Sequence, residues 1–318
     1  MLQRHTLFSL LLALFVAAPA FGQDAALEWR FTKDKPFYQT MTTTTTQNMT
    51  VTGTKVEQKQ DQTFYFMWTP TKIDKEKNTV TLEQKIIGLK MNIDIGGSKI
   101  THDSTAPKEA AGAANNPLNK FFDALNNATF TITLDTKEMK VTNIEGHDKF
   151  VAKLTDANPS MKPLLEKILS KEALKDMAEP MFAALPGKTE KKGATWKRTS
   201  SLDMGPIGKY ETTYNYTYEG PDKDKNEKIG VKTDLKYTKP ENVAANLPFK
   251  ITAATLEAKD STGTVVYDPK AGWVKSSEMT MKLTGNLTIE ISQQSTAVDL
   301  SQEQTTKTTT SAENPIKK

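Results

Sequence analysis

Polar and apolar residues alternate with a period of two over most of this 318-residue chain, which is the pattern of half-buried β-strands. In the first half the pattern is clearest in residues 37–51, 55–73 and 79–95. Phe64, Phe66 and Trp68 fall on one face of the second stretch by this period. Gly96 and Gly97 follow the third stretch and predict a tight hairpin. Successive strands joined by short turns predict an antiparallel meander.

Apolar residues at helical spacing interrupt the strands in the middle of the chain. Asn116 can cap a short helix that starts at Pro117 and carries Phe121 on its apolar face. After a hairpin within residues 129–144, three more short helices are expected at residues 148–154, 159–169 and 171–178. Pro180 is expected to stop this run of helices.

The second of these three helices carries an apolar stripe. Leu165 and Ile168 lie on it, and Asn158 and Ser170 are the expected helix caps on either side. A face that packs on a sheet is the simplest interpretation of this stripe. A lid or a surface that binds a partner is the alternative.

The strand pattern resumes in the second half. It covers residues 195–204, 209–219, 228–238, 249–259, 264–267, 273–283, 287–291 and 297–306. Tyr214, Tyr216 and Tyr218 share one face of the second of these strands, either as a cross-strand aromatic row or as a stacking platform for a sugar or a lipid. The residues expected to face a ligand or to pack around it are Tyr214, Tyr216, Tyr218, Phe121, Leu165 and Ile168.

The two halves share a signal that indicates an internal duplication. Asp103-Ser104-Thr105 and Asp260-Ser261-Thr262 each come before a similar hairpin, which turns at Asp135 in the first half and at Asp268 in the second. A loop and a helix separate the two parts of the signal in the first half only. Each Asp-Ser-Thr run is interpreted as a turn that ends a strand, because short Asp and Ser side chains bond to nearby backbone amides.

This organisation divides the chain into five segments. They are a signal peptide at 1–22, an N-terminal antiparallel β-unit with an inserted helix at 23–147, a helical connector at 148–192, a C-terminal antiparallel β-unit at 193–310 and a disordered tail at 311–318.

The first segment has the three parts of a secretory signal peptide. Arg4 and His5 form a basic start, residues 7–16 are almost wholly apolar, and small residues then allow cleavage after Ala20 or after Gly22. The apolar stretch is shorter than the roughly 20 residues that span a bilayer. We therefore expect a periplasmic or secreted protein that does not span the membrane once the signal is removed.

Composition and charge exclude several classes of function. Without any cysteine, the exported fold must rest on burial and sheet hydrogen bonds, and no cysteine is available for a lipid anchor. The formal charge of +4 comes from lysines scattered among nearly as many carboxylates, and Arg30 and Arg198 are the only arginines beyond the signal. Nucleic-acid binding is not expected without a clustered basic patch.

Candidate chemistry is sparse. The run His102-Asp103-Ser104 resembles the components of a hydrolase, but consecutive strand residues point to alternate faces and cannot form a relay. No zinc spacing, calcium loop, phosphate loop or nucleophile elbow is present. No catalytic residue, metal site or cofactor is therefore predicted.

Short motifs spread over nearly the whole chain beyond the signal point to a family. They lie at residues 27–29 (Leu-Glu-Trp), 81–85, 91–97, 103–105, 115–117, 202–208 and 247–250. In these motifs the chain resembles an uncharacterised family of exported proteins that is best represented in planctomycete-type bacteria. The resemblance implies export and a domain of unknown function, and it supplies no catalytic residues.

We expect a mainly β protein with minor α content. Its curved, duplicated antiparallel meander forms either two half-barrels or one continuous sheet around the central helices, similar to the bacterial lipoprotein-carrier architecture. The leading hypothesis is a non-enzymatic envelope protein that binds an apolar or amphipathic ligand, such as a lipid, between sheet and helices. The alternatives are a structural or protein-binding component of the envelope and a hydrolase whose carboxylates meet only in the fold.

Overall fold

The computed structural model describes residues 24–106, 117–240, 250–291 and 293–316, so the predicted signal peptide lies outside the described residues. The strands are β1 (Ala25–Leu27), β2 (Phe37–Val51), β3 (Thr54–Asp74), β4 (Thr79–Ile95), β5 (Ser98–Asp103), β6 (Thr129–Asp135), β7 (Lys140–Glu145), β8 (Lys188–Glu190), β9 (Thr195–Asp203), β10 (Lys209–Pro221), β11 (Glu227–Thr238), β12 (Lys250–Asp268), β13 (Trp273–Ile291) and β14 (Gln294–Ser311). The helices are α1 (Pro117–Leu125), α2 (His147–Ala157), α3 (Lys162–Ile168) and α4 (Lys171–Ala183), with 3-10 turns at Pro159–Met161 and Gly205–Ile207.

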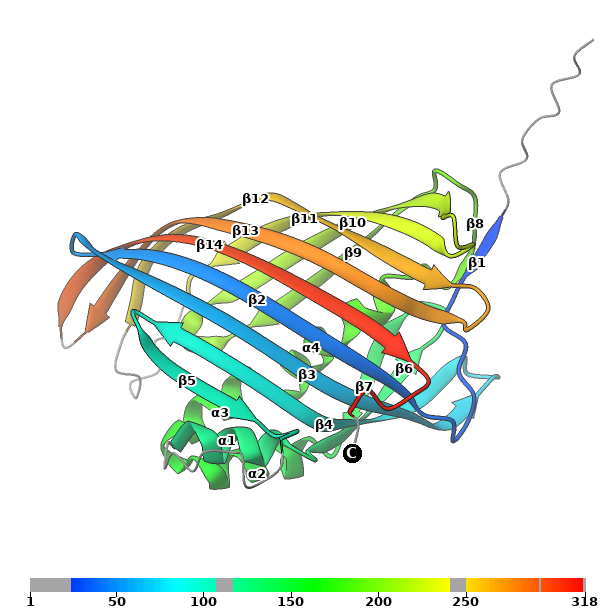
Figure 1. The fold of residues 1–318 in the computed structure, drawn as a ribbon, viewed down its shortest axis with the longest axis horizontal. Coiled ribbons are helices and arrows are strands. Elements are labelled where there is room, and N and C mark those ends of the chain that lie inside the picture. The colour runs from blue at the N-terminus through cyan, green and yellow to red at the C-terminus, as the bar shows by residue number, and fades with distance from the viewer. Residues whose placement is uncertain (1–23, 107–116, 241–249, 292, 317–318) are drawn as a thin grey trace, which may run out of the picture.

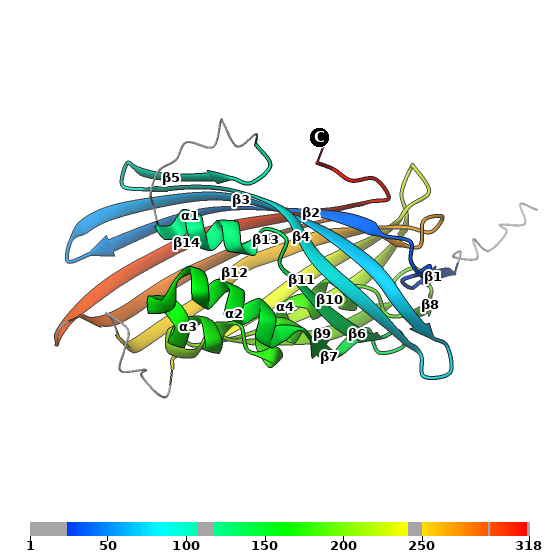
Figure 2. The same cartoon turned by 90° about the horizontal axis from the view of Figure 1, so that it is seen from below.

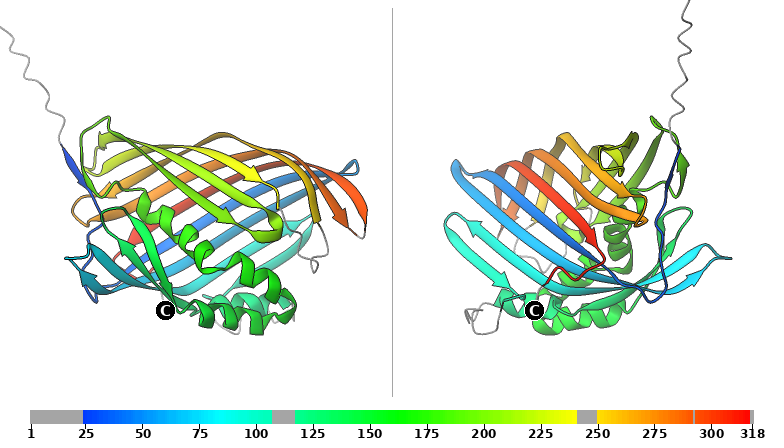
Figure 3. Two further views of the ribbon diagram at one scale, coloured as in Figure 1. Left: turned by 180° about the vertical axis from the view of Figure 1, so that it is seen from behind. Right: turned by 45° about the vertical axis from the view of Figure 1, so that its right-hand side comes forward.

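Twelve of the strands form one antiparallel sheet. Its order is β7-β6-β4-β3-β2-β14-β13-β12-β11-β10-β9, and β5 pairs with β4 off this path. The strands β1 and β8 form a separate two-stranded sheet. The large sheet bends into a trough, and α2, α3 and α4 lie along its open side (Figures 1, 2 and 3). The predicted mainly β fold is confirmed, and of its two forms the chain adopts the continuous sheet.

Helix α4 lies between the two edge strands of this sheet, β7 and β9. The backbone N–H of Val141 in β7 donates to Glu179 Oε2 over 3.1 Å. On the other side, the Ser200 hydroxyl of β9 donates to the Asp176 carbonyl oxygen over 3.3 Å. The helix thus contacts both edge strands, and its Glu179 pairs a backbone N–H that β7 would otherwise leave open.

The continuation of α4 through Pro180 corrects the prediction that this proline stops the helical run. Pro180 lies inside the helix, which ends at Ala183. A proline has no N–H for the carbonyl four residues earlier, which here belongs to Asp176. Because the Ser200 hydroxyl bonds to that carbonyl, the helix loses less than the usual cost of an internal proline. The predicted cap at Ser170 is confirmed, since its side chain accepts from Ala173 N.

Two predicted strand breaks in the second half are also wrong, because β12 and β13 run without interruption. Asp260-Ser261-Thr262 lies at an irregularity in the β12–β13 register, where Asp260 has a φ of 49°. A bulge takes up the extra residue and lets the strand continue. In β13 the backbone passes so close to β12 that a Cβ at Gly285 would lie 1.8 Å from the Thr255 carbonyl oxygen, so only glycine fits there.

The first half shows the predicted end of a strand at Asp103, where β5 stops. The Asp103 carboxylate accepts from the Thr105 backbone N–H over 2.8 Å. Asp135 and Asp268 make the same turn contacts in the two hairpins, since Oδ1 of each accepts the backbone N–H two residues later over 2.8 Å. The duplication itself and the boundaries of the segments other than the C-terminal tail stay predictions.

Residues 311–316 differ from the predicted disordered tail. Ser311 belongs to β14, and the backbone N–H of Ile316 donates to Asn314 Oδ1 over 2.9 Å. The Ile316 side chain covers Gly88, where an added Cβ would lie 2.7 Å from Ile316 Cδ1.

Alternation along each strand separates a concave from a convex set of side chains. One row on the concave face joins Thr308, Met41 and Phe64 across β14, β2 and β3. In β14 the charged residues all fall on the convex face, namely Asp299, Glu303 and Lys307. The trough is therefore lined by uncharged side chains along its central strands.

Candidate functional site

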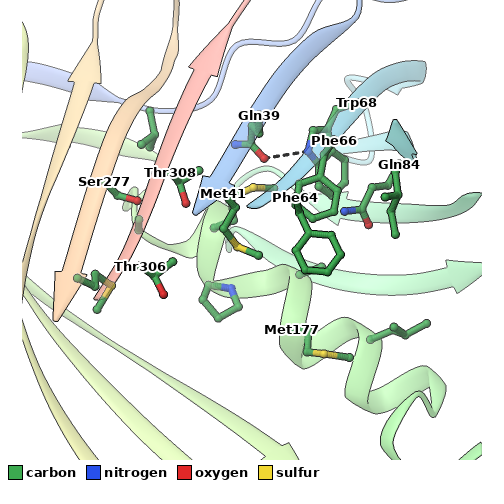
Figure 4. Close-up of a pocket in the computed structure, with 18 of the residues that line it drawn as sticks. Gln39, Met41, Phe64, Phe66, Trp68, Gln84, Met177, Ser277, Thr306 and Thr308 are labelled. Atoms are coloured by element: carbon green, nitrogen blue, oxygen red, sulfur yellow. Dashed lines mark hydrogen bonds between the residues drawn. The ribbon is translucent and has the colours of Figure 1, made fainter. Parts of the chain in front are cut away.

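A cavity of about 430 Å³ lies on the concave face between the sheet and α4. Its volume falls within the range of about 300–1,000 Å³ that is typical of small-molecule sites. The close-up shows side chains from β2, β3, β4, β13 and β14 converging on it, with α4 on the other side (Figure 4).

Aromatic and methionine side chains form the wall on the sheet side. Phe64 and Phe66 stack with ring centroids 5.7 Å apart, and Met41 lies beside them on the neighbouring strand. Met279 reaches the same space from β13. Methionine adapts its unbranched side chain to irregular partners, so such a wall can accept ligands of varied shape.

A buried polar network lies at one end of the cavity. Trp68 Nε1 donates to Gln39 Oε1 over 2.8 Å, and Gln39 Nε2 donates to Thr310 Oγ1 over 3.3 Å. All three side chains are buried. Because their polar atoms bond to one another, the network adds no unpaired donor to the cavity.

Helix α4 supplies the opposite wall with small and flexible apolar side chains. Leu174, Ala178 and Met181 line the cavity, and so does Met177. Met177 is 44% exposed, which shows that the cavity reaches solvent beside this residue. The opening of the cavity thus lies next to α4.

None of the described side chains that line the cavity is charged. Two of them, Tyr214 and Tyr216, carry ionisable hydroxyls. Burial raises the pKa of both hydroxyls above the ordinary tyrosine value, so they stay neutral at physiological pH. The cavity offers an apolar surface with neutral hydroxyl and amide groups.

The predicted tyrosine row divides between cavity and core. Tyr214 and Tyr216 line the cavity, and their rings stack at 6.1 Å. Tyr218 is 1% exposed and its hydroxyl donates to Glu227 Oε2, so it belongs to the packed end of the trough.

The other three predicted residues lie in the helical layer. Leu165 of α3 is buried in the core, while Ile168 and Phe121 are partly buried and pack against it. None of the three lines the cavity. Whether any of these six residues faces a ligand stays a prediction.

Sequence reasoning missed most of the cavity lining. Gln39 and Met41 lie in a strand that carries threonines on both faces, so its pattern does not mark the inner face. The signal that could have found them is the aromatic face of β3, since Phe64 and Phe66 require apolar neighbours on adjoining strands.

The run at His102 does not assemble a catalytic relay. The His102 ring lies 5.2 Å from the Phe122 ring, Asp103 accepts from Thr105, and the Ser104 hydroxyl accepts from Leu89 N. Among the described residues, no group of three or more His, Asp or Glu side chains is placed to hold a metal ion. No helix within the described residues is long and apolar enough to cross a membrane.

The fold and cavity define a class of protein: an open, curved antiparallel sheet that holds an apolar pocket under a helix. By sequence, the chain belongs to the DUF6263 family, a family of unknown function, which matches residues 77–274. This agrees with the predicted domain of unknown function, whereas export and the range of organisms stay predictions. No curated protein matches the sequence.

Similarity to solved structures is weak. A lipovitellin structure, described as showing lipid–protein interactions, has 11% identity and a TM-score of 0.43 over 91% of this chain. The match spans 26% of the lipovitellin chain. An outer membrane channel from Pseudomonas putida F1 has 5% identity and a TM-score of 0.24, with 89% of this chain and 98% of that chain covered.

Proposed function

We propose that this protein binds one apolar or amphipathic ligand in the cavity between the trough and α4. The observation that carries the proposal is a space of about 430 Å³ whose described lining consists of aromatic, methionine, aliphatic and neutral polar side chains, without a charged group. Moving apolar ligand surface from water into such a space is favourable by roughly 25 cal/mol per Å². The proposed role is binding or carriage, without chemistry on the ligand.

The opening beside Met177 supports an amphipathic ligand. A polar end can stay near solvent at this exposed residue while the apolar part lies against Phe64 and Phe66. Pockets that work in this way are largely preformed and use few polar contacts for orientation.

An uncharged fluorescent probe tests the proposal directly. N-phenyl-1-naphthylamine emits strongly in apolar surroundings, and we expect the purified protein to raise its emission with saturation at one site. Thr308→Trp places a large ring in the cavity, whereas Thr309→Trp places the same ring on the exposed convex face of β14. We expect the first variant to lose probe binding and the second to keep it.

Two results would contradict the proposal. One is a wild-type protein that leaves the probe emission unchanged. The other is equal binding by Thr308→Trp and Thr309→Trp when both have the circular dichroism of the wild type, since the probe would then lie elsewhere.

We further propose that the protein acts after export, as the N-terminal pattern predicts. The mature protein is then expected to begin at Phe21 or Gln23, which N-terminal sequencing of protein from its own cells can read. A mature chain that begins at Met1 or Leu2 would contradict this part of the proposal.

A further inference from the structure

Two buried N–H donors lie on the concave face of β9, and neither has an acceptor among the described residues. They are the indole Nε1 of Trp196 and the guanidinium Nε of Arg198. Residues two apart on a strand point to the same face, about 6–7 Å from each other. Buried donors without partners are uncommon in folded proteins and call for a specific explanation.

Both donors adjoin the proposed ligand cavity. In the β9–β10 register Trp196 is opposite Tyr216, and Arg198 is opposite Tyr214. The Trp196 ring stacks on the Tyr216 ring at 5.4 Å with 13° between the planes. Both tyrosines line the cavity, whereas Trp196 and Arg198 do not, so the two donor residues lie one strand beyond the cavity lining on the β9 side.

Arg198 also brings a positive charge to the concave face of β9, where its neighbours two residues away, Trp196 and Ser200, are uncharged. Its neighbours Lys197 and Thr199 lie on the convex face and are exposed. None of the salt bridges in the described part of the chain includes Arg198. A partly buried cation without a counter-ion is unfavourable, and an anion that reached it would relieve this cost.

We propose that the ligand is an anionic single-chain amphiphile whose headgroup binds at Trp196 and Arg198. An oxygen of its carboxylate or phosphate accepts from the indole N–H, and another accepts from the guanidinium, while the hydrocarbon chain lies in the cavity. Charge-assisted bonds of this kind are about twice as strong as neutral ones. This inference rests on the proposed function and adds the chemical class of the ligand.

Displacement of N-phenyl-1-naphthylamine by three ligands with the same chain length tests the inference. The ligands are palmitate, hexadecyl phosphate and uncharged hexadecanol. We expect the wild type to bind at least one of the two anions more tightly than the alcohol, and the stronger anion identifies the headgroup. Arg198→Gln should weaken binding of that anion by about tenfold or more and leave hexadecanol unchanged.

Lys197→Gln is the matched control, since it removes the same charge from the adjacent residue on the exposed face. We expect it to leave all three affinities unchanged. Trp196→Phe keeps an aromatic ring against Tyr216, removes the N–H donor together with part of the ring, and keeps the charge of Arg198, so it should weaken the anions less than Arg198→Gln does. This second variant keeps the test decisive if Arg198→Gln does not fold.

The outcomes separate the two proposals. If hexadecanol binds as tightly as both anions, or if neither Arg198→Gln nor Trp196→Phe changes the ratio of anion to alcohol affinity, the headgroup site is wrong and the apolar cavity stands. If neither the probe nor any of the three ligands binds, the proposed function itself is wrong.

Discussion

The two faces of the central strands carry different chemistry although their residues alternate along the same backbone. On the convex face of β14, Glu303 and Lys307 form ion pairs with β13 at 3.7 Å and 3.1 Å. On its concave face, Thr306 and Thr308 line the cavity. A threonine-rich strand can therefore be polar on both faces while only one face is charged, and the uncharged face holds the cavity.

The largest expected effect comes from removing an aromatic side chain on the concave face. Trp68 is 2% exposed and stacks on Phe37 at 6.3 Å, so Trp68→Ala should lower the free energy of unfolding by about 3–5 kcal/mol. Met67→Ala changes the preceding residue, on the other face, and should lower the free energy of unfolding by less than about 1.5 kcal/mol. Urea denaturation of both variants measures the difference, and similar losses would contradict the contrast between the faces.

A carboxylate placed on each face should give the next largest effect. Thr43 is 6% exposed and its hydroxyl lies 3.1 Å from that of Thr306, so Thr43→Asp buries a carboxylate without a cation. Burial raises the pKa of this new carboxyl, and each unit costs about 1.4 kcal/mol at pH 7. We expect a loss of about 2–4 kcal/mol that shrinks as the pH falls toward 4, because the neutral acid is cheaper to bury.

Thr46→Asp is the control for this carboxylate. Thr46 pairs with Lys59 and with Glu303 on the convex face, where the two opposite charges nearly offset each other. Its unfolding free energy should stay within about 0.5 kcal/mol of the wild type, with little dependence on pH. Equal pH profiles for the two variants would show that Thr43 is not buried in solution.

Breaking the polar network at the end of the cavity should have a smaller effect. Gln39→Leu leaves the Trp68 indole N–H buried without its acceptor, at a cost of about 1–3 kcal/mol. Thr40→Leu changes the adjacent residue on the convex face and should cost little. Thermal unfolding measures both variants. A Gln39→Leu midpoint equal to that of the wild type would contradict the hydrogen-bond network.

The smallest expected effect concerns Asp176 of α4, whose pKa is raised by burial and then by the nearby Glu179 carboxylate. Its charged form is therefore less favourable in the folded than in the unfolded chain, so it lowers stability above its folded pKa. Asp176→Asn should stabilise the protein at pH 7 by less than about 1 kcal/mol, since the group is partly solvated. The gain should vanish below the ordinary value of 3.8, and a gain that persists there would have another cause.

Local patterns were sufficient to predict much of the sheet. The predicted ends of β2 and β4 agree with the structure at both termini. The C-terminal ends are marked by glycine turns with positive φ, at Gly53 and at Gly96-Gly97. The face of Tyr214 and Tyr216 was also predicted, since period two along β10 is regular.

Long-range contacts decide the features that sequence reasoning missed. Helix α4 continues beyond Pro180, and the Ser200 hydroxyl of β9 donates to the Asp176 carbonyl that the proline leaves without a helical N–H. No local pattern reveals that partner. The cavity likewise needs side chains from strands at opposite ends of the chain, such as Met41 and Met279. Local periodicity identifies which face of a strand is buried. The cavity between the sheet and α4 depends on how the whole sheet bends.

The pairing of β2 with β14 has a consequence for how the chain folds. These two strands lie at the centre of the sheet, with Tyr38 opposite Ser311, although β2 is among the first strands to be synthesised and β14 is the last in the described chain. Contacts between such distant segments slow folding, because a long loop must close before they form. Until β14 arrives, β2 is a long edge open to aggregation, so holding the chain unfolded until synthesis is complete would favour the correct structure.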